Sequence, residues 1–289
     1  MPELPEVEVV KRSLNNKVQN LIIKEVKIID GRLRYPIYKK EIIKVVGLKL
    51  KKIRRRSKFL LFFFNKNIVM LIHLGMTGKI FFVSQKRTIH KTSFYYFINE
   101  DKDYKHDRII FNLSQNKKLI YNDVRKFGFI KFFKKKNLNQ NLHLKDLGPE
   151  PLSKKFDFKY FKKYVLNRNR MVKDILMDQK FVSGLGNIYV NEILFLSKIK
   201  PNKRTKNLNI GEMKKIIYFT KSILKKSIKE GGSSIKDFND SEGKQGVFQQ
   251  QFNVYGREGE KCTTGKCDKV IKKMVISQRA TFFCKSCQK

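Results

Sequence analysis

Four cysteines near the C-terminal end of the chain form the clearest chemical group in the sequence. Four residues separate Cys262 from Cys267, sixteen separate Cys267 from Cys284, and two separate Cys284 from Cys287. Two close pairs on either side of a hairpin-length spacer suit tetrahedral zinc, because each pair supplies two thiolates from one tight turn. Four unrelated buried thiols are the alternative, and they explain the clustering less well. We therefore predict one structural Zn²⁺, which would supply most of the folding energy of so small a ribbon.

The first residues, MPELPEVEVV, combine two prolines with several carboxylates. Pro5 suits the first turn of a helix, and Glu6 suits the positive end of the helix dipole. Apolar residues from Val7 onward recur at helical spacing, so a short helix is predicted here. These preferences do not explain why so basic a chain begins with Pro2 and Glu3.

Two internal motifs place unusual side chains in turns between apolar runs. HLGMTG contains His73 and Met76 in a turn bounded by glycines, and a methionine there is either a core residue or a wedge between bases. YNDVRKFG contains Arg125 and Phe127, which suit either base stacking or packing on their own sheet. The patterns alone leave both alternatives open.

Two further motifs have an ordinary interpretation beside a functional one. RRRSKFLLF is a basic run that leads into an apolar strand, as a solvated strand end would. VSGLGNIYVNEILF joins two predicted helices through Gly184 and Gly186, with Asn187 expected at the N-cap. The exposed amides of this helix start, together with Asn187 and Lys173, could instead hold a phosphate.

The chain carries 65 Lys and Arg against 25 Asp and Glu, a formal net charge of +40, and its pI is about 10.1. A polyanion is the natural partner, because each neutralised phosphate releases counterions and favours association. An AT-rich coding sequence would also enrich lysine, so the charge supports nucleic acid without proving it. No apolar stretch is long enough to span a membrane, and acids stand where a signal peptide would be basic. We expect a soluble protein of the cytoplasm.

Short runs rich in Ile, Val, Phe and Tyr follow one another from about residue 20 to 135 and predict an antiparallel β-sandwich. After LGPEPL, apolar residues recur at helical spacing in FKYFKKYVL, MVKDILMDQKFV, NIYVNEILFLSKI and GEMKKIIYFTKSILKKSI. The helices should end at Gly231 and Gly232, and VFQQQFNVYG is expected to be a strand that enters the cysteine segment. The predicted domains are 1–149, 150–249 and 250–289.

The motifs PELPEVE, HLGMTG, YNDVRKFG, LGPEPL, LMDQKFVSGLGNIYVNE and QRATFFCKSCQK occur in this order, and together they resemble bacterial formamidopyrimidine-DNA glycosylases. The resemblance implies an α+β multidomain fold: an N-terminal antiparallel β-sandwich with flanking helices, a helix-two-turn-helix domain and a zinc ribbon with four cysteine ligands. It implies a monomeric, nucleoid-associated bacterial repair enzyme that acts on double-stranded DNA. Such enzymes excise oxidised purines, notably 8-oxoguanine and formamidopyrimidines, and then cleave the abasic site by β,δ-elimination.

The resemblance gives the N-terminal residues catalytic roles. Once Met1 is removed, Pro2 offers a free secondary amine that attacks C1′ of the flipped nucleotide. An α-amino group titrates near ~8, whereas lysine titrates near ~10.4, so more of it is unprotonated at neutral pH. The attack yields an iminium, which makes elimination of the phosphates feasible. Glu3 is the expected general acid for the sugar ring oxygen, and Glu6 supports the site.

The remaining roles also rest on the resemblance. Lys58 is expected to contact the phosphates beside the lesion and assist β-elimination, and Arg279 to bind phosphate and assist δ-elimination. Met76, Arg125 and Phe127 match the triad that fills the gap left by the flipped base. The family contacts the phosphate backbone at positions that correspond to His73, His106, Lys126, Arg168, Lys173, Asn187 and Tyr189.

The loop from Ser233 to Gly246 matches the one that closes over the flipped base. There the main-chain carbonyl of Ser233 is expected to accept the N7 hydrogen that distinguishes 8-oxoguanine from guanine, with Lys236 nearby. The chain departs from the family pattern at three places. The first cysteine pair encloses TTGK instead of two residues, Arg108 stands where a histidine is usual, and DVRKFG replaces DPRRFG.

Two other functions remain possible from the residues. An endonuclease VIII-like glycosylase would act on oxidised pyrimidines, but its N-terminus and wedge residues differ from those quoted above. A basic nucleic-acid-binding protein without catalysis would need only the positive charge and the zinc ribbon, but it would leave Pro2, Glu3 and Glu6 unexplained.

Overall fold

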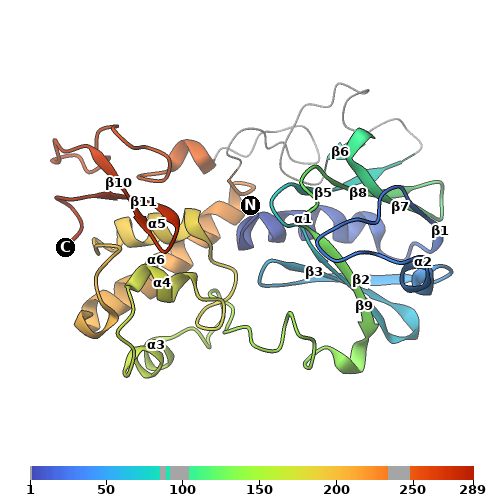
Figure 1. Ribbon diagram of the computed structural model, residues 1–289, viewed down its shortest axis with the longest axis horizontal. Coiled ribbons are helices and arrows are strands. Elements are labelled where there is room, and N and C mark those ends of the chain that lie inside the picture. Colours follow the sequence, from blue (N-terminus) through green and yellow to red (C-terminus); the bar gives the residue numbers. More distant parts are fainter. Residues whose placement is uncertain (1, 85–88, 92–103, 234–247) are drawn as a thin grey trace. The chain divides into compact units, whose positions relative to one another are not determined.

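The computed structural model describes residues 2–84, 89–91, 104–233 and 248–289 of the chain (Figure 1). The chain forms two compact units. One comprises Met1–Lys145 together with Glu230–Val247, and the other comprises Asp146–Lys229 together with Phe248–Lys289. The helical segment and the cysteine segment therefore belong to the same unit. The three-domain division into 1–149, 150–249 and 250–289 stays a prediction.

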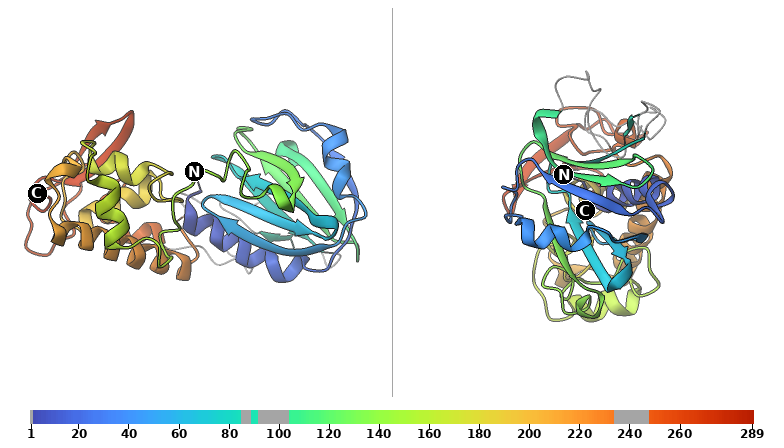
Figure 2. Two further views of the ribbon diagram at one scale, coloured as in Figure 1. Left: turned by 90° about the horizontal axis from the view of Figure 1, so that it is seen from below. Right: turned by 90° about the vertical axis from the view of Figure 1, so that its right-hand side faces the viewer.

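The N-terminal unit contains two antiparallel sheets, which Figure 2 shows as two layers. One sheet has the order β1 (Ile23–Ile28), β7 (Asp107–Leu113), β8 (Lys118–Asp123), β5 (Gly78–Val83) and β6 (Ile89–Lys91). The other has the order β2 (Leu50–Arg56), β3 (Phe59–Phe64), β4 (Ile68–His73) and β9 (Phe129–Lys134). Side chains of both sheets and of helix α1 pack into one core. The predicted antiparallel sandwich with a flanking helix is confirmed.

Helix α1 (Leu4–Val18) begins directly after Glu3. Pro5 lies in its first turn, where the missing N–H costs no helical hydrogen bond. Val7 and Leu14 are fully buried in the sandwich core, as the apolar spacing predicts. The shorter helical elements of this unit are α2 (Lys39–Ile42), η1 (Ile43–Val45), η2 (Asn65–Asn67), η3 (Tyr104–His106) and η4 (Lys135–Asn137).

The C-terminal unit is helical and ends in a hairpin. Its helices are α3 (Phe158–Val165), α4 (Val172–Met177), α5 (Asn187–Leu196), η5 (Thr205–Asn207), α6 (Ile210–Lys229) and η6 (Phe248–Gln251). The hairpin consists of β10 (Ile271–Ile276) and β11 (Arg279–Cys284). Helix α5 is apolar on nearly all sides and is buried, whereas α6 buries only one face. Among the described residues, no helix combines the length and apolar character needed to cross a membrane.

Three local predictions for this unit are wrong in detail. The described part of VFQQQFNVYG, from Phe248 onward, is not a strand: Phe248 and Phe252 both pack into the helical core four residues apart, which suits a helical turn. The chain that follows donates its amides to a buried glutamate, Glu192, and not to a neighbouring strand. The predicted helix MVKDILMDQKFV ends at Met177. The N-cap of α5 is Gly186, so Asn187 is the first helical residue.

Candidate functional site

The two carboxylates at the start of α1 are buried, each with 2% of its surface exposed. One oxygen of Glu6 accepts a hydrogen bond from the backbone N–H of Glu3 at 2.7 Å. Its other oxygen accepts from the backbone N–H of Ser233 at 2.9 Å and from the Ser233 hydroxyl at 2.8 Å. Pro2, which immediately precedes Glu3, is buried as well. The structure thus brings together Pro2, Glu3, Glu6 and Ser233 from the two ends of this unit.

Lys58 lies in the tight turn between β2 and β3 and is 8% exposed. The guanidinium of Arg55 donates to the carbonyl of Ser57 at 2.8 Å and to the Glu8 carboxylate of α1 at 3.0 Å. Burial raises the pKa of Glu8, but Arg55 and the other basic neighbours outweigh it and hold that pKa below its usual value. The Glu8–Arg55 ion pair therefore connects the turn that carries Lys58 to the helix that begins directly after Glu3.

His73 ends β4, directly opposite Phe59 at the start of β3. Burial and the nearby charge of Lys58 lower the pKa of His73 to about 4. Its Nδ1 accepts from the N–H of Gly75 at 3.1 Å, so the neutral ring carries its hydrogen on Nε2. At neutral pH His73 can offer a phosphate one N–H donor but no positive charge.

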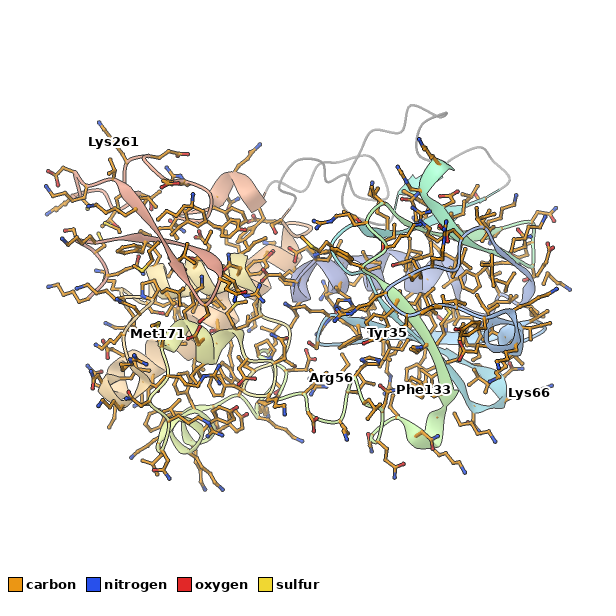
Figure 3. All side chains as sticks on the ribbon, viewed as in Figure 1. Tyr35, Arg56, Lys66, Phe133, Met171 and Lys261 are labelled. Atoms are coloured by element: carbon orange, nitrogen blue, oxygen red, sulfur yellow. The ribbon has the colours of Figure 1, made fainter. Side chains whose placement is uncertain are left out.

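An aromatic cluster surrounds His73, and two of its members, Tyr35 and His143, belong to none of the sequence motifs. The His73 ring stacks on Phe129 with 5.3 Å between ring centres. His143 lies on the same Phe129 at 4.6 Å, and Tyr35 packs edge-on to it at 5.0 Å. Tyr35 lies beside β9 (Figure 3). His143 is an isolated histidine in a polar segment, so the sequence held no signal for it.

The turns that carry Met76 and the pair Arg125 and Phe127 adjoin one another, because Gly78 of β5 pairs with Asp123 of β8. Met76 and Phe127 are 36% and 45% exposed, although both are apolar. The Arg125 guanidinium lies 4.7 Å from the centre of the Phe127 ring. The structure therefore presents all three predicted wedge residues on one edge of the sandwich.

Two departures from the family pattern, Arg108 and Lys126, meet at Asp30, a carboxylate that belongs to none of the motifs. Lys126 Nζ lies 2.7 Å and Arg108 Nη1 3.2 Å from the same oxygen of Asp30. Hydrogen bonds from Arg32 and Lys126 hold the pKa of Asp30 well below its usual range. Arg108 also lies 3.4 Å from Nδ1 of His106. Lys126, predicted to contact phosphate, is thus already paired with an acid.

The C-terminal unit holds the other predicted contacts, some of them buried. Arg279 is exposed at the start of β11, after a tight turn. Lys173 is only 1% exposed, and its ammonium donates to the Thr281 hydroxyl at 2.6 Å and the Ala280 carbonyl at 3.2 Å. Asn187 donates to that same carbonyl at 2.9 Å. Burial and the charge of Arg279 lower the pKa of Lys173 to about 8. Both residues therefore support the strand that begins at Arg279.

Tyr189 and Arg168 differ in accessibility. Tyr189 is fully buried, and its hydroxyl shares a hydrogen bond of 2.5 Å with Ser227. Arg168 is exposed, with its guanidinium 4.0 Å from the centre of the Tyr164 ring. A pocket of about 540 Å³ in this unit is lined by residues that include Arg170, Lys173 and Arg279. The lining also includes the acids Asp174 and Asp178, and Arg170 pairs with Asp178 at 2.9 Å, so three cations and two acids meet beside the ribbon hairpin.

The four cysteines converge, and their sulfur atoms all lie within 4.8 Å of one another. The Cys262–Cys287 and Cys267–Cys284 sulfur pairs are 3.8 and 3.7 Å apart. A tetrahedral zinc with Zn–S bonds of about 2.3 Å requires sulfur separations of about 3.8 Å, so the group fits one Zn²⁺. The four-residue knuckle closes through a hydrogen bond from the Cys267 N–H to the Thr264 carbonyl at 2.8 Å. Lys261, next to Cys262, marks this region in Figure 3.

Glu192, to which the sequence motifs assigned no role, joins α5 to the chain that enters the ribbon. It is fully buried, and its carboxylate accepts from the backbone N–H groups of Asn253, Val254 and Tyr255, each at 2.9 Å. A glutamate inside the otherwise apolar run NIYVNEILF was a signal for such a role, because a carboxylate is buried only when it is hydrogen-bonded or paired.

Lys236 and residues 234–246 of the predicted lesion-closing loop lie outside the described residues, as does Met1.

Family models match three parts of the chain. They are the formamidopyrimidine-DNA glycosylase N-terminal domain at residues 1–130, its H2TH domain at residues 147–239, and a zinc finger found in FPG and IleRS at residues 259–289.

Known proteins resemble the chain over its full length. A formamidopyrimidine-DNA glycosylase of Rickettsia bellii (strain OSU 85-389) is 41% identical over 289 residues, with 100% of both chains covered. One of Bradyrhizobium sp. (strain ORS 278) is 36% identical over 295 residues, also with 100% of both covered. A Lactococcus lactis FPG mutant, solved with Fapy-dG-containing DNA, matches with a TM-score of 0.86, 31% identity and 100% of both chains covered. The L. lactis Fpg complex with abasic-site DNA matches with a TM-score of 0.85, 32% identity and 99% of both covered.

Proposed function

Because the chain belongs to the formamidopyrimidine-DNA glycosylase family, we propose that it excises oxidised purines from duplex DNA and then cleaves the abasic site by β,δ-elimination. It is a DNA glycosylase of base-excision repair, from a family of bifunctional glycosylases and abasic-site lyases. The match over the full chain, including the N-terminal PELPEVE, carries the proposal. The substrates proposed are 8-oxoguanine and formamidopyrimidines.

The proposed reaction begins at Pro2. With Met1 removed, the Pro2 nitrogen attacks C1′, so that an N–C1′ bond forms as the glycosidic bond to the damaged base breaks. Glu3 donates a proton to the sugar ring oxygen, the ring opens, and an iminium remains. The iminium accepts the electron pair released when a C2′ proton is removed, and the 3′ phosphate leaves. A second elimination releases the 5′ phosphate. Pro2 and Glu3 are adjacent, and the hydrogen bond from the Glu3 N–H to Glu6 holds this segment at the start of α1, which supports the assignment.

In the proposed mechanism, Glu6 connects the reacting residues Pro2 and Glu3 to Ser233, which would recognise the lesion. Its carboxylate binds the Glu3 backbone on one side and Ser233 on the other. The N–H and the hydroxyl of Ser233 donate to Glu6, so its carbonyl is the group proposed to accept N7–H of 8-oxoguanine. Guanine carries no hydrogen on N7 and would gain no such bond, which is the proposed basis of discrimination.

Lys58 and Arg279 supply the proposed phosphate contacts at the reaction centre. The Glu8–Arg55 pair positions the turn that carries Lys58, and Lys173 with Asn187 supports the strand that begins at Arg279. Cys262, Cys267, Cys284 and Cys287 would hold one zinc. That ion would act structurally, by stabilising the hairpin from which Arg279 projects.

The proposed partner is DNA that contains oxidised purines or abasic sites. The L. lactis relatives were solved with Fapy-dG-containing and abasic-site DNA, and the chain's net charge of +40 suits a polyanion. Chromosomal DNA as substrate would place the activity at the bacterial nucleoid, in the cytoplasm.

Borohydride trapping tests the proposal directly, because reduction converts the iminium into a stable covalent adduct. Protein whose loss of Met1 has been verified by mass spectrometry is incubated with three duplexes that contain 8-oxoguanine opposite cytosine, thymine glycol or an abasic site. We expect adducts with the first and third duplexes, and their weakening or loss in Pro2→Gly and Glu3→Gln. A preference for thymine glycol would indicate a pyrimidine glycosylase, and no adduct with any duplex would exclude the mechanism.

A further inference from the structure

The three side chains proposed to enter the DNA stack come from two separate turns of the N-terminal unit. Met76 lies between β4 and β5, whereas Arg125 and Phe127 lie between β8 and β9. Exposed turns are normally mobile, and side chains that must fill one gap together gain from being held in a fixed arrangement. The contacts between the two turns therefore bear on the reaction.

The two turns touch backbone to backbone. Gly75 has a φ of +62°, and a Cβ atom placed on it would lie 2.4 Å from the nitrogen of Gly128 and 2.8 Å from the carbonyl oxygen of Phe127. A Cβ atom on Gly128 would lie 2.7 Å from the carbonyl oxygen of His73. Any side chain at either glycine would push the turns apart, so the close approach requires both glycines.

A hydroxyl and a carboxylate join the same two turns. The Thr77 hydroxyl donates to Asp123 Oδ1 at 2.5 Å and accepts from the backbone N–H of Arg125 at 3.0 Å. Asp123 is fully buried, and its Oδ2 accepts from the N–H of Gly128 at 2.9 Å and from the Tyr121 hydroxyl at 3.2 Å. Thr77 and Asp123 therefore bind the second turn at both of its ends, next to Arg125 and next to Phe127.

We propose that Thr77 and Asp123 form a latch that holds Met76, Arg125 and Phe127 as one preassembled wedge. This inference rests on the proposed function, and it makes Thr77 and Asp123 positioning residues for base excision. Because the latch already fixes the two turns relative to each other, they lose less conformational entropy when the wedge enters the DNA double helix. The latch therefore acts on the step in which the damaged base leaves the stack. It plays no part in the chemistry at Pro2.

Thr77→Val tests the latch, because valine keeps the shape of threonine while it removes the hydroxyl. We expect single-turnover excision of 8-oxoguanine opposite cytosine to slow by roughly tenfold, as the loss of two hydrogen bonds suggests. A 2-aminopurine placed beside the lesion reports unstacking, and its fluorescence rise should slow in parallel. Thr77→Ser keeps the hydroxyl and should restore both signals to within about twofold.

Thr220→Val is the matched control. Thr220 lies in α6 of the other unit and is fully buried, and its hydroxyl has no hydrogen-bond partner among the described residues. Thr220→Val therefore makes the same chemical change as Thr77→Val, but in a threonine that is not part of the wedge. We expect parental excision and parental 2-aminopurine kinetics from it.

Cleavage of a preformed abasic site separates the latch from the proposed function, because no base has to be unstacked there. Borohydride trapping on that substrate counts active molecules, and every rate is expressed per active molecule, so partial unfolding of Thr77→Val does not obscure the result. If the parent neither traps nor cleaves the abasic site, the proposed function fails. If the parent does and Thr77→Val excises 8-oxoguanine at the parental rate, the latch is overturned. Equal slowing on the lesion and the abasic site would overturn it too.

Discussion

Glu6 and Ser233 are joined by two hydrogen bonds, from the backbone N–H at 2.9 Å and the hydroxyl at 2.8 Å, both to one carboxylate oxygen. The two residues are 227 positions apart in the chain. The second oxygen of Glu6 binds the backbone N–H of Glu3. The buried Glu6 carboxylate thus accepts hydrogen bonds both from the proposed general acid, Glu3, and from Ser233, the residue proposed to recognise the lesion.

Glu6→Gln should affect base excision more than abasic-site cleavage. A glutamine side chain can still accept from Ser233 through its oxygen, but its NH₂ group cannot accept from the N–H of Glu3. We expect excision of 8-oxoguanine to slow by roughly tenfold or more, because a buried donor loses its acceptor. Abasic-site cleavage should change less, since that substrate has no base for Ser233 to recognise. Single-turnover rates on the two duplexes measure the difference, with Ser233→Ala as the milder comparison. Equal losses on both substrates would contradict this role for Glu6.

His73 should make the protein less stable in mild acid. Its pKa is about 4 in the folded chain, against a usual value of 6.5. The unfolded state therefore takes up a proton as the pH falls below about 6.5, whereas the folded state does so only near pH 4. Stability from this residue is complete above pH 6.5 and is lost as the pH falls toward 4, by up to about 3 kcal/mol. Urea unfolding at pH 7 and pH 4.5 measures the loss. The free energy of unfolding of His73→Gln should fall less than that of the parent between pH 7 and pH 4.5. An equal fall in the two proteins would show that a group other than His73 causes the loss.

Asp30→Asn should increase binding to undamaged DNA. Asp30 pairs with Lys126 and Arg108 as well as with Arg32, so removal of its charge leaves one more net positive charge close to Arg125. We expect log Kd against log salt to steepen by roughly one, as for one additional phosphate contact. Fluorescence anisotropy across a salt series measures the slope. Glu25→Gln changes the net charge equally at an exposed acid beside Lys27, and it is the control. If the two variants gave the same slope, general charge and not Lys126 would be responsible.

Loss of the metal should unfold the ribbon and weaken the functions proposed for Arg279. We expect one zinc per chain by elemental analysis, despite the enlarged Cys262–Cys267 knuckle. Treatment with a strong chelator, or Cys284→Ser, should abolish hairpin structure and reduce abasic-site DNA affinity by about tenfold or more, because metal binding supplies the folding energy of such a site. Readdition of Zn²⁺ should restore binding to the chelated parent but not to the variant. Metal-free protein with parental affinity would show that the ribbon folds without zinc.

Much of the fold could be predicted because the relevant patterns are local. Short runs rich in Ile, Val, Phe and Tyr predict the sandwich strands, three-and-four spacing predicts α1 and α6, and paired cysteines predict the metal centre. The errors occur where a tertiary contact overrides a local preference. VFQQQFNVYG has the composition of a strand, yet Phe248 and Phe252 pack on the helices and Glu192 takes up the following amides.

The candidate site divides in the same way. Its motif residues could be found from the sequence, but their solvent accessibility could not. The chain has many lysines, and nothing in the sequence distinguishes a buried lysine from an exposed one. Lys173 supports the ribbon from inside, whereas Arg168 reaches solvent. His143 and Asp30 had no motif to reveal them, since their roles come from neighbours far away in the chain.

The sequence by itself determined which residue types stand close together: Pro2 beside Glu3, four cysteines in two pairs, and Met76 and Phe127 within short polar segments. These features depend on residue type and short spacing, which the covalent chain sets before it folds. Only the tertiary structure decided the partnerships of Glu6 with Ser233, of Asp30 with Arg108 and Lys126, and of Thr77 with Asp123. Each of these pairs joins elements that are distant in the sequence. The pairs therefore form only after the two sheets, and the later segment that contains Ser233, have come together in the folded unit.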